Sequence, residues 1–267
     1  MRSTRTAESR KTSSAGPARL AGVAEGPSVD RAEVERFAAM AEAWWDPFGN
    51  FAPLHKLNPV RVGYVRDKAC TRFDRDPTGD KPLKGLSVLD IGCGGGLLCE
   101  PIRRLGADVV GIDASEDNIA AAAAHARQSK LAIDYRVSSV EALAAEGRRF
   151  DIVLNMEVVE HVADVDAFLA ASLAIVETGG ILIIATLNRT AQSFALAIVA
   201  AEYVLGWLPR GTHDWRKFLR PSELAAHLRA HGGEIRELTG VRFSPLTDRF
   251  SIGPDLSVNY MALVERV

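Results

Sequence analysis

The chain has few cysteines for its length. Its 267 residues include only Cys70, Cys93 and Cys99, and no two of them have the C-x-x-C spacing. An odd count without that spacing argues against a disulfide framework or a zinc knuckle, and it favours a reducing compartment. Stability must then come from a hydrophobic core, which a chain of this length with 47% hydrophobic residues can form.

Positive charge is not in excess either. Lys and Arg number 32 against 34 Asp and Glu, which leaves a formal net charge of −2. A nucleic-acid binder usually shows a marked basic excess. We therefore expect no nucleic acid among the partners.

Long hydrophobic runs are also missing. The most apolar stretch, Phe194–Pro209, carries Glu202 in its middle and falls short of the roughly 20 apolar residues that a membrane-spanning helix needs. The N-terminus lacks the apolar core of a secretory signal and is rich in Ser, Arg, Ala and Gly. We predict a disordered extension over residues 1–30, with a transit peptide as the alternative, and a single domain over residues 31–267.

What the chain does contain is an alternation of apolar segments and helical patterns. Short apolar segments predict buried strands over residues 86–91, 107–113, 133–139, 150–156 and 181–188. Helical patterns lie between several of them, over residues 97–106, 115–130 and 164–180. This alternation predicts a Rossmann-like α/β fold, with a mostly parallel, doubly wound sheet and helices on both faces. Helices over residues 29–45 and from Pro59 to residue 73 predict an N-terminal helical cover.

A glycine-rich loop follows the first predicted strand. In the sequence VLDIGCGGG, Gly92 and Gly94 would let backbone N–H groups approach a ligand closely. Asp113 ends the second predicted strand, where a carboxylate can accept hydrogen bonds from the hydroxyls of a ribose. Because ligands of parallel sheets bind beyond the carboxyl ends of the strands, we expect the loop and the acid to form one nucleoside-cofactor site.

Two cofactors compete for such a site. A nicotinamide dinucleotide needs the spacing G-x-G-x-x-G, and Leu97 stands where the third glycine should be. Asp90, just before the loop, would sit poorly beside a pyrophosphate but would suit the cationic end of S-adenosylmethionine. The pattern D-x-G-x-G-x-G resembles the first motif of Rossmann-like methyltransferases. We therefore favour S-adenosylmethionine and keep an NAD-dependent oxidoreductase as the alternative.

Charged side chains gather after the fourth predicted strand. The stretch NMEVVEHVAD contains Glu157, Glu160 and His161. If residues 157–161 form a helical turn, these three side chains share one face and could hold a divalent ion, with Mg²⁺ as the expected metal. Two other interpretations stay open. His161 could act alone as a general base, or the stretch could have a structural role.

Five segments outside the glycine loop carry a more specific resemblance. They are WWDPFGNFAPLHKLNPVRVGYV from Trp44, TLNRT from Thr186, AEYVLGWLPRGTHDW from Ala201, SPLTDRFSIGP from Ser244 and VNYM from Val258. In this order they resemble the ubiquinone-biosynthesis O-methyltransferases, which are class I S-adenosylmethionine-dependent enzymes. The resemblance implies methylation of phenolic hydroxyls on 2-polyprenyl-6-hydroxyphenol and 3-demethylubiquinol. Another S-adenosylmethionine-dependent small-molecule methyltransferase is the alternative.

The same resemblance implies site residues. By motif position, the cofactor contacts fall on Arg61, Gly92, Asp113 and Met156, and Gly94 belongs to the same loop. Arg61 could hold the carboxylate of the methionine moiety in a bidentate pair. Met156 could place its backbone or its side chain against the cofactor. Some members of the family are described as metal-dependent through the EVVEH positions, which supports the metal interpretation without settling it.

A polyprenyl tail lies in a bilayer, so a membrane contact is expected. We predict a helical insertion over residues 187–220 whose Tyr203 and Trp207, with basic neighbours such as Arg216, suit a helix on an anionic membrane surface. A lid over the active site is the alternative interpretation. The resemblance implies a bacterial cytoplasmic protein at the inner membrane, or else one on the matrix side of the mitochondrial inner membrane. It also implies partners in a ubiquinone-biosynthesis complex.

Overall fold

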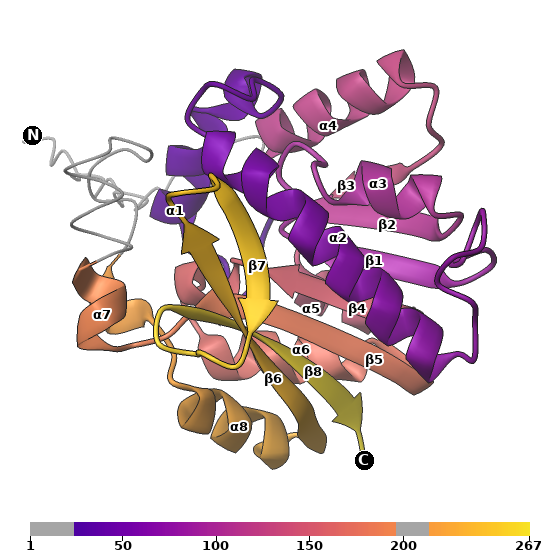
Figure 1. The fold of residues 1–267 in the computed structure, drawn as a ribbon. Coiled ribbons are helices and arrows are strands. Elements are labelled where there is room, and N and C mark those ends of the chain that lie inside the picture. The colour runs from indigo at the N-terminus through magenta and orange to yellow at the C-terminus, as the bar shows by residue number, and fades with distance from the viewer. Residues whose placement is uncertain (1–23, 196–213) are drawn as a thin grey trace, which may run out of the picture.

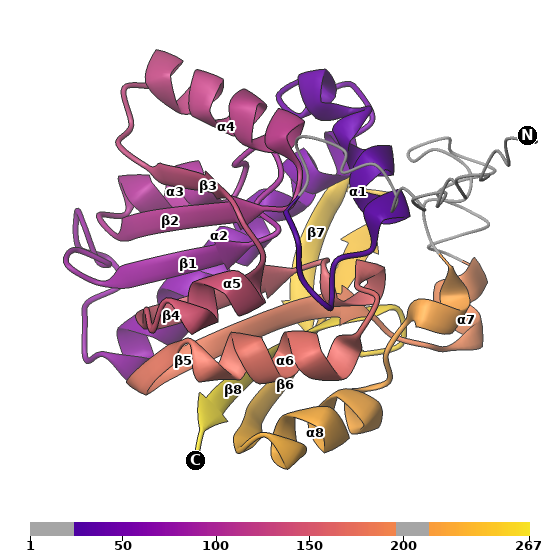
Figure 2. The ribbon, with the colours of Figure 1, turned by 180° about the vertical axis from the view of Figure 1, so that it is seen from behind.

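The computed structural model describes residues 24–195 and 214–267, and Figures 1 and 2 show it from opposite sides. The strands are β1 (Ser87–Ile91), β2 (Asp108–Asp113), β3 (Asp134–Val137), β4 (Phe150–Met156), β5 (Val176–Leu187), β6 (Gly233–Ser244), β7 (Arg249–Gly253) and β8 (Asn259–Arg266). The α-helices are α1 (Arg31–Ala38), α2 (Ala52–Arg72), α3 (Cys99–Arg104), α4 (Glu116–Gln128), α5 (Val140–Ala145), α6 (Val165–Ala174), α7 (Ala191–Ser193) and α8 (Pro221–Ala230). Short 3-10 helices are η1 (Ala41–Ala43), η2 (Val159–His161) and η4 (Trp215–Lys217).

These strands form one sheet with the order β3-β2-β1-β4-β5-β8-β6-β7. The pairs among β1 to β5 are parallel, whereas β8 is antiparallel to β5 and β6, and β7 is antiparallel to β6. The chain builds outward from β1 to β3 and then crosses back to place β4 on the other side of β1. The fold is therefore the predicted α/β type with a mostly parallel sheet, and its switch point lies between β1 and β4.

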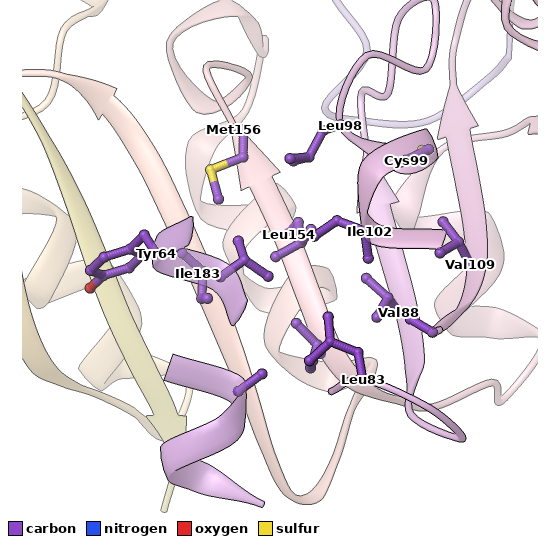
Figure 3. Close-up of a cluster of buried hydrophobic side chains, with 14 of the residues drawn as sticks. Tyr64, Leu83, Val88, Leu98, Cys99, Ile102, Val109, Leu154, Met156 and Ile183 are labelled. Atoms are coloured by element: carbon purple, nitrogen blue, oxygen red, sulfur yellow. The ribbon is translucent and has the colours of Figure 1, made fainter. Parts of the chain in front are cut away.

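Helices cover both faces of the sheet. α2 crosses the face in front in Figure 1, and α5 and α6 cover the opposite face, which is in front in Figure 2. Strand side chains alternate between the two cores, so that Leu154 and Ile183 pack beneath α2 and α3 (Figure 3), while Val153 packs with α6. Burial on both faces is the reason why strands such as ILIIA are continuously apolar.

The second helix begins earlier than predicted. α2 begins at Ala52 with Pro53 in its first turn, whereas the sequence predicted a start at Pro59. The rule that proline suits a helix start holds for Pro53, but Pro59 lies inside the helix. The adjacent Asn58 side chain donates a hydrogen bond to the Leu97 carbonyl at 2.7 Å. This contact ties the middle of α2 to the chain just before α3.

The helix predicted over residues 164–180 is wrong in its second half. α6 ends at Ala174, and β5 begins at Val176. The Phe150 N–H donates to the Ile175 carbonyl at 3.0 Å, so pairing with β4 already starts there. The apolar pattern suits either element, and the tertiary pairing with β4 decides it.

Two predicted segments lie partly outside the described residues. Of the extension predicted over residues 1–30, residues 24–30 are described, and the Ala24 N–H donates to the Ala114 carbonyl at 2.9 Å. Of the insertion predicted over residues 187–220, residues 196–213 lie outside the described part, and α7 and η4 flank them. Within the described ranges, no helix is long and apolar enough to cross a membrane.

Candidate active site

A cavity of about 990 Å³ opens at the carboxyl ends of the parallel strands. Its walls are the loop after β1, the ends of β2 and β4, helices α1 and α2, and the β6–β7 hairpin. Figure 1 shows α1 and this hairpin at the same edge of the molecule. The lining includes every predicted cofactor contact: Arg61, Gly92, Gly94, Asp113 and Met156. A cavity of this size can hold a cofactor and a second small molecule.

The glycine loop needs its glycines for two physical reasons. Gly92 and Gly94 have φ angles of 66° and 52°, in the left-handed region that favours glycine. A Cβ on Gly92 would lie 2.5 Å from Val158 Cγ2, and one on Gly94 would lie 2.4 Å from Trp44 Cζ2. Backbone conformation and close packing therefore both exclude larger residues from this part of the cavity wall.

Asp113 organises the loop from the end of β2. One carboxylate oxygen accepts a hydrogen bond from the Gly94 N–H at 3.0 Å, and the other accepts from the Ser115 N–H at 2.8 Å and the Asn118 side chain at 3.2 Å. Burial raises the pKa of Asp113 against the opposing effect of these donors. A carboxylate has about four lone-pair sites, so capacity remains for a ribose hydroxyl.

Asp90 lies below the loop and does not line the cavity. Its side chain is buried and accepts a hydrogen bond from the Cys99 thiol, with Sγ and Oδ2 3.1 Å apart. Burial raises the pKa of Asp90 to about 7, while Cys99 and Arg61 act in the opposite direction. Asp90 therefore has no direct contact with the cavity, and any effect on a cationic ligand would act through space.

Arg61 and Met156 approach the same cavity from different elements. Arg61 projects from α2, is 6% exposed, and forms an ion pair with Glu157 in which Nη2 and Oε1 are 3.0 Å apart. Its Nε has no hydrogen-bond partner among the described residues, so the guanidinium has capacity for a ligand carboxylate. Met156 ends β4 and belongs to the core beneath α2, where Figure 3 shows it. It is both a core residue and part of the cavity wall.

Glu157, Glu160 and His161 do not converge on one point. Glu157 pairs with Arg61, as described above. The carboxyl of Glu160 is buried and accepts a hydrogen bond from the Thr186 hydroxyl at 2.9 Å. The Nδ1 atom of His161 lies 3.2 Å from a carboxylate oxygen of Glu33.

The structure therefore does not support the predicted Mg²⁺ site at these residues. The prediction assumed an α-helical turn, but Glu157 has a φ of 60° and residues 159–161 form a short 3-10 helix. This backbone sends the three side chains toward different partners. Within the described ranges, no group of three or more His, Cys, Asp or Glu side chains is placed to hold a metal ion.

Replacing Glu160 distinguishes a structural role of its carboxyl group from a role as a metal ligand. Burial and the charge of Glu157 raise the pKa of Glu160 to about 8. The folded state therefore keeps a proton that the unfolded chain loses above pH 4.5, and stability falls as the pH rises between these values. We expect Glu160→Gln to raise the free energy of unfolding at pH 8 by on the order of 1–3 kcal/mol, and to leave methyl transfer largely intact.

The measurement is urea unfolding of both proteins at pH 4 and pH 8. The difference in the free energy of unfolding between Glu160→Gln and wild type should shrink toward pH 4. The control Glu177→Gln, at an exposed position, should unfold with the same free energy as wild type at both pH values. Loss of activity in a stable Glu160→Gln protein would contradict the structural role.

Sequence reasoning missed residues of the cavity wall that come from the N-terminal segment. Trp44 donates a hydrogen bond from Nε1 to Asn118 at 2.9 Å and stacks on Phe51 with ring centroids 3.8 Å apart. Glu33 of α1 lies beside His161. The sequence predicted one helix over residues 29–45, but the structure has α1 over Arg31–Ala38 and the short η1 after it. No local pattern linked Glu33 to a residue far along the chain.

Comparisons with known proteins place this geometry in a family. Residues 63–238 match the model of a methyltransferase domain. The ubiquinone biosynthesis O-methyltransferases of Sinorhizobium fredii and Rhizobium etli are each 56% identical to this chain over 239 residues, which cover 90% of this chain and 96% of the relative. That of Brucella ovis is 54% identical with the same coverage. The chain belongs to the ubiquinone biosynthesis O-methyltransferase family.

Membership confirms the predicted activity class. This family member is an S-adenosylmethionine-dependent O-methyltransferase, and the oxidoreductase alternative is excluded. Solved structures agree in fold. Magnesium protoporphyrin IX methyltransferase from Synechocystis PCC 6803 with bound S-adenosylmethionine is 17% identical, has a TM-score of 0.58, and covers 91% of this chain and 100% of its own. The plantazolicin methyltransferase BpumL is also 17% identical, with a TM-score of 0.58 over 88% of this chain and 97% of its own.

Proposed function

We propose that this O-methyltransferase methylates phenolic hydroxyls of polyprenylated ubiquinone precursors, namely 2-polyprenyl-6-hydroxyphenol and 3-demethylubiquinol. The names of its relatives support this substrate class. The observation that carries the proposal is that one cavity is lined both by the glycine loop and by the aromatic rings of Phe37, Phe243 and Phe250. The rings of Phe243 and Phe250 lie 5.0 Å apart on the β6–β7 hairpin, which suits an aromatic headgroup with an apolar tail.

The cofactor end of the cavity fits S-adenosylmethionine. In this proposal Asp113 accepts hydrogen bonds from the ribose, and Arg61 holds the carboxylate of the methionine moiety. Gly92, Gly94 and Met156 supply the close wall. When bound, the cofactor supplies an activated methyl group, so the protein needs to contribute alignment and a reactive oxygen.

A phenol is a poor nucleophile until it loses its proton. With a pKa near 10, it is about a thousandfold too protonated at pH 7, which corresponds to roughly 4 kcal/mol. We propose that His161, which lines the cavity, accepts this proton as a general base. Holding the oxygen in line with the methyl carbon can contribute roughly 7–11 kcal/mol more.

The direct test is methyl transfer to a short-chain polyprenyl catechol. We expect product in the presence of a strong chelator, because the donors of the predicted metal site have other partners in this structure. Loss of activity with chelator and recovery on adding Mg²⁺ would contradict a metal-free base. Absence of product with and without metal, despite bound S-adenosylmethionine, would contradict the substrate class.

Location and partners follow from the same proposal. A polyprenylated substrate resides in a bilayer, so the enzyme would act as a peripheral protein at an anionic membrane surface, in a bacterial cytoplasm. Its relatives come from bacteria. Partners in a ubiquinone-biosynthesis complex are a further part of the proposal, and they rest on the family relationship.

A further inference from the structure

Helix α1 places a carboxylate against the proposed general base. Oε2 of Glu33 lies 3.2 Å from Nδ1 of His161, although the two residues are 128 positions apart in the sequence. Their side chains are only 12% and 13% exposed, so water screens the contact weakly. The ring of Phe37, one helical turn after Glu33, meets the imidazole edge-on with centroids 5.1 Å apart. The imidazole is therefore held by two side chains of the same helix.

Other charges hold Glu33 in place. Its second oxygen, Oε1, lies 3.3 Å from Nζ of Lys217, and Nη1 of Arg36 lies 3.0 Å from Oε2. Lys217 also binds Asp30 at 3.0 Å, which joins η4 to the start of α1. Burial acts to raise the pKa of Glu33, but His161, Arg36 and Lys217 together lower it to about 2. Glu33 is therefore ionised at neutral pH.

The backbone fixes α1 against the His161 segment independently of this contact. Asp30 caps α1 by accepting hydrogen bonds from the N–H groups of Ala32 and Glu33. Just before the helix, the Ser28 carbonyl accepts a hydrogen bond from the Ala163 N–H at 2.8 Å, two residues after His161. The position of Glu33 relative to His161 is thus set by the docked backbone as well as by the side chains.

Helix α1 also lies outside the part of the chain that matches the methyltransferase domain, residues 63–238. Glu33 and Phe37 nevertheless line the same cavity as the glycine loop. The N-terminal segment thus adds a charged group to the cavity wall beyond what the shared domain provides.

We propose that Glu33 is the positioning residue of His161, accepting the Nδ1–H so that Nε2 faces the substrate as the proton acceptor. The inference rests on the proposed role of His161 as general base. An imidazole with its proton on Nδ1 carries its lone pair on Nε2. When the phenol O–H breaks and the Nε2–H forms, the ring becomes an imidazolium. Glu33 stabilises this cation and stays ionised, as the buried carboxylate does in a Ser-His-Asp triad.

The test compares Glu33→Gln, Glu33→Asp and the matched control Glu35→Gln, an exposed position on the same helix. We expect Glu33→Gln to lower kcat for a short-chain polyprenyl catechol by roughly 10–100-fold, since misplacing a catalytic group by about 1 Å can cost about 10²-fold. Glu33→Asp, which keeps the charge, should recover part of the loss. Glu33→Gln should lower the melting temperature modestly, because the ion pairs with Lys217 and Arg36 are lost. The variant should stay folded at the assay temperature and keep its calorimetric affinity for S-adenosylmethionine, and Glu35→Gln should behave as wild type.

A double variant separates positioning from structural support. If Glu33 acts through His161, adding Glu33→Gln to a His161→Gln protein should not lower kcat any further. An additive loss of kcat in the double variant, or a Glu33→Gln protein that is unfolded at the assay temperature, would overturn the proposal. Wild-type kcat in Glu33→Gln together with an inactive His161→Gln would also overturn it while leaving the general base in place. An active His161→Gln would instead remove the proposed base itself.

Discussion

His161→Gln is expected to lower kcat for a polyprenyl catechol by on the order of 10²–10⁴-fold, the usual contribution of a general base. The variant loses the group that accepts the phenol proton, while the cofactor end of the cavity stays intact. Steady-state kinetics at pH 7 measure the loss. Raising the pH toward 10 should restore part of the activity, because the phenol then ionises without help.

The control for this experiment is His227→Gln. His227 pairs with Asp166 between α8 and α6, away from the cavity, and its replacement should leave kcat unchanged. A His161→Gln protein that stays inactive at every pH but still binds S-adenosylmethionine would point to a role in binding or shaping the site. Such a result would contradict the general-base role.

Arg61→Met is expected to weaken S-adenosylmethionine binding by roughly 10–100-fold, since a hydrogen bond to a charged group contributes about 1.5–3 kcal/mol. The variant removes the only charge proposed to hold the methionine carboxylate and keeps most of the side-chain volume. It also leaves Glu157 without its ion-pair partner, so unfolding must be measured alongside. Calorimetry gives the affinity, and Arg61→Lys should show a smaller loss.

A second ligand makes the Arg61 prediction sharper. Methylthioadenosine has the nucleoside and the sulfur but no carboxylate, so its affinity should be the same for Arg61→Met and wild type. Asp113→Asn provides the opposite case. It should lower the affinity for both ligands, because both carry the ribose. An equal loss of affinity for both ligands in Arg61→Met would contradict the proposal that Arg61 binds the carboxylate, and it would indicate a collapsed site.

The sequence alone determined the fold and predicted that the glycine loop and Asp113 meet at one edge of the sheet. Alternating strand and helix patterns predicted the parallel sheet, and the structure confirms it with β1 to β5. Gly92, Gly94 and Asp113 stand at strand ends, and parallel strands bring such ends together at one edge. These inferences depend on local periodicity and on a general rule of sheet topology, so they need no knowledge of distant contacts. Segment similarity then predicted the family, which the relatives confirm.

Only the tertiary structure showed which partners the charged side chains after β4 contact. The spacing of Glu157, Glu160 and His161 suggested one helical face. The left-handed backbone of Glu157 and the 3-10 helix over residues 159–161 instead point the three side chains in different directions. Each side chain then takes a partner from another element: Arg61 of α2, Thr186 of β5 and Glu33 of α1. Thr186 lies 26 residues from Glu160 in the chain, and Glu33 lies 128 residues from His161. Local spacing can show that such groups share a site, but their chemistry depends on partners that only the folded chain brings to them.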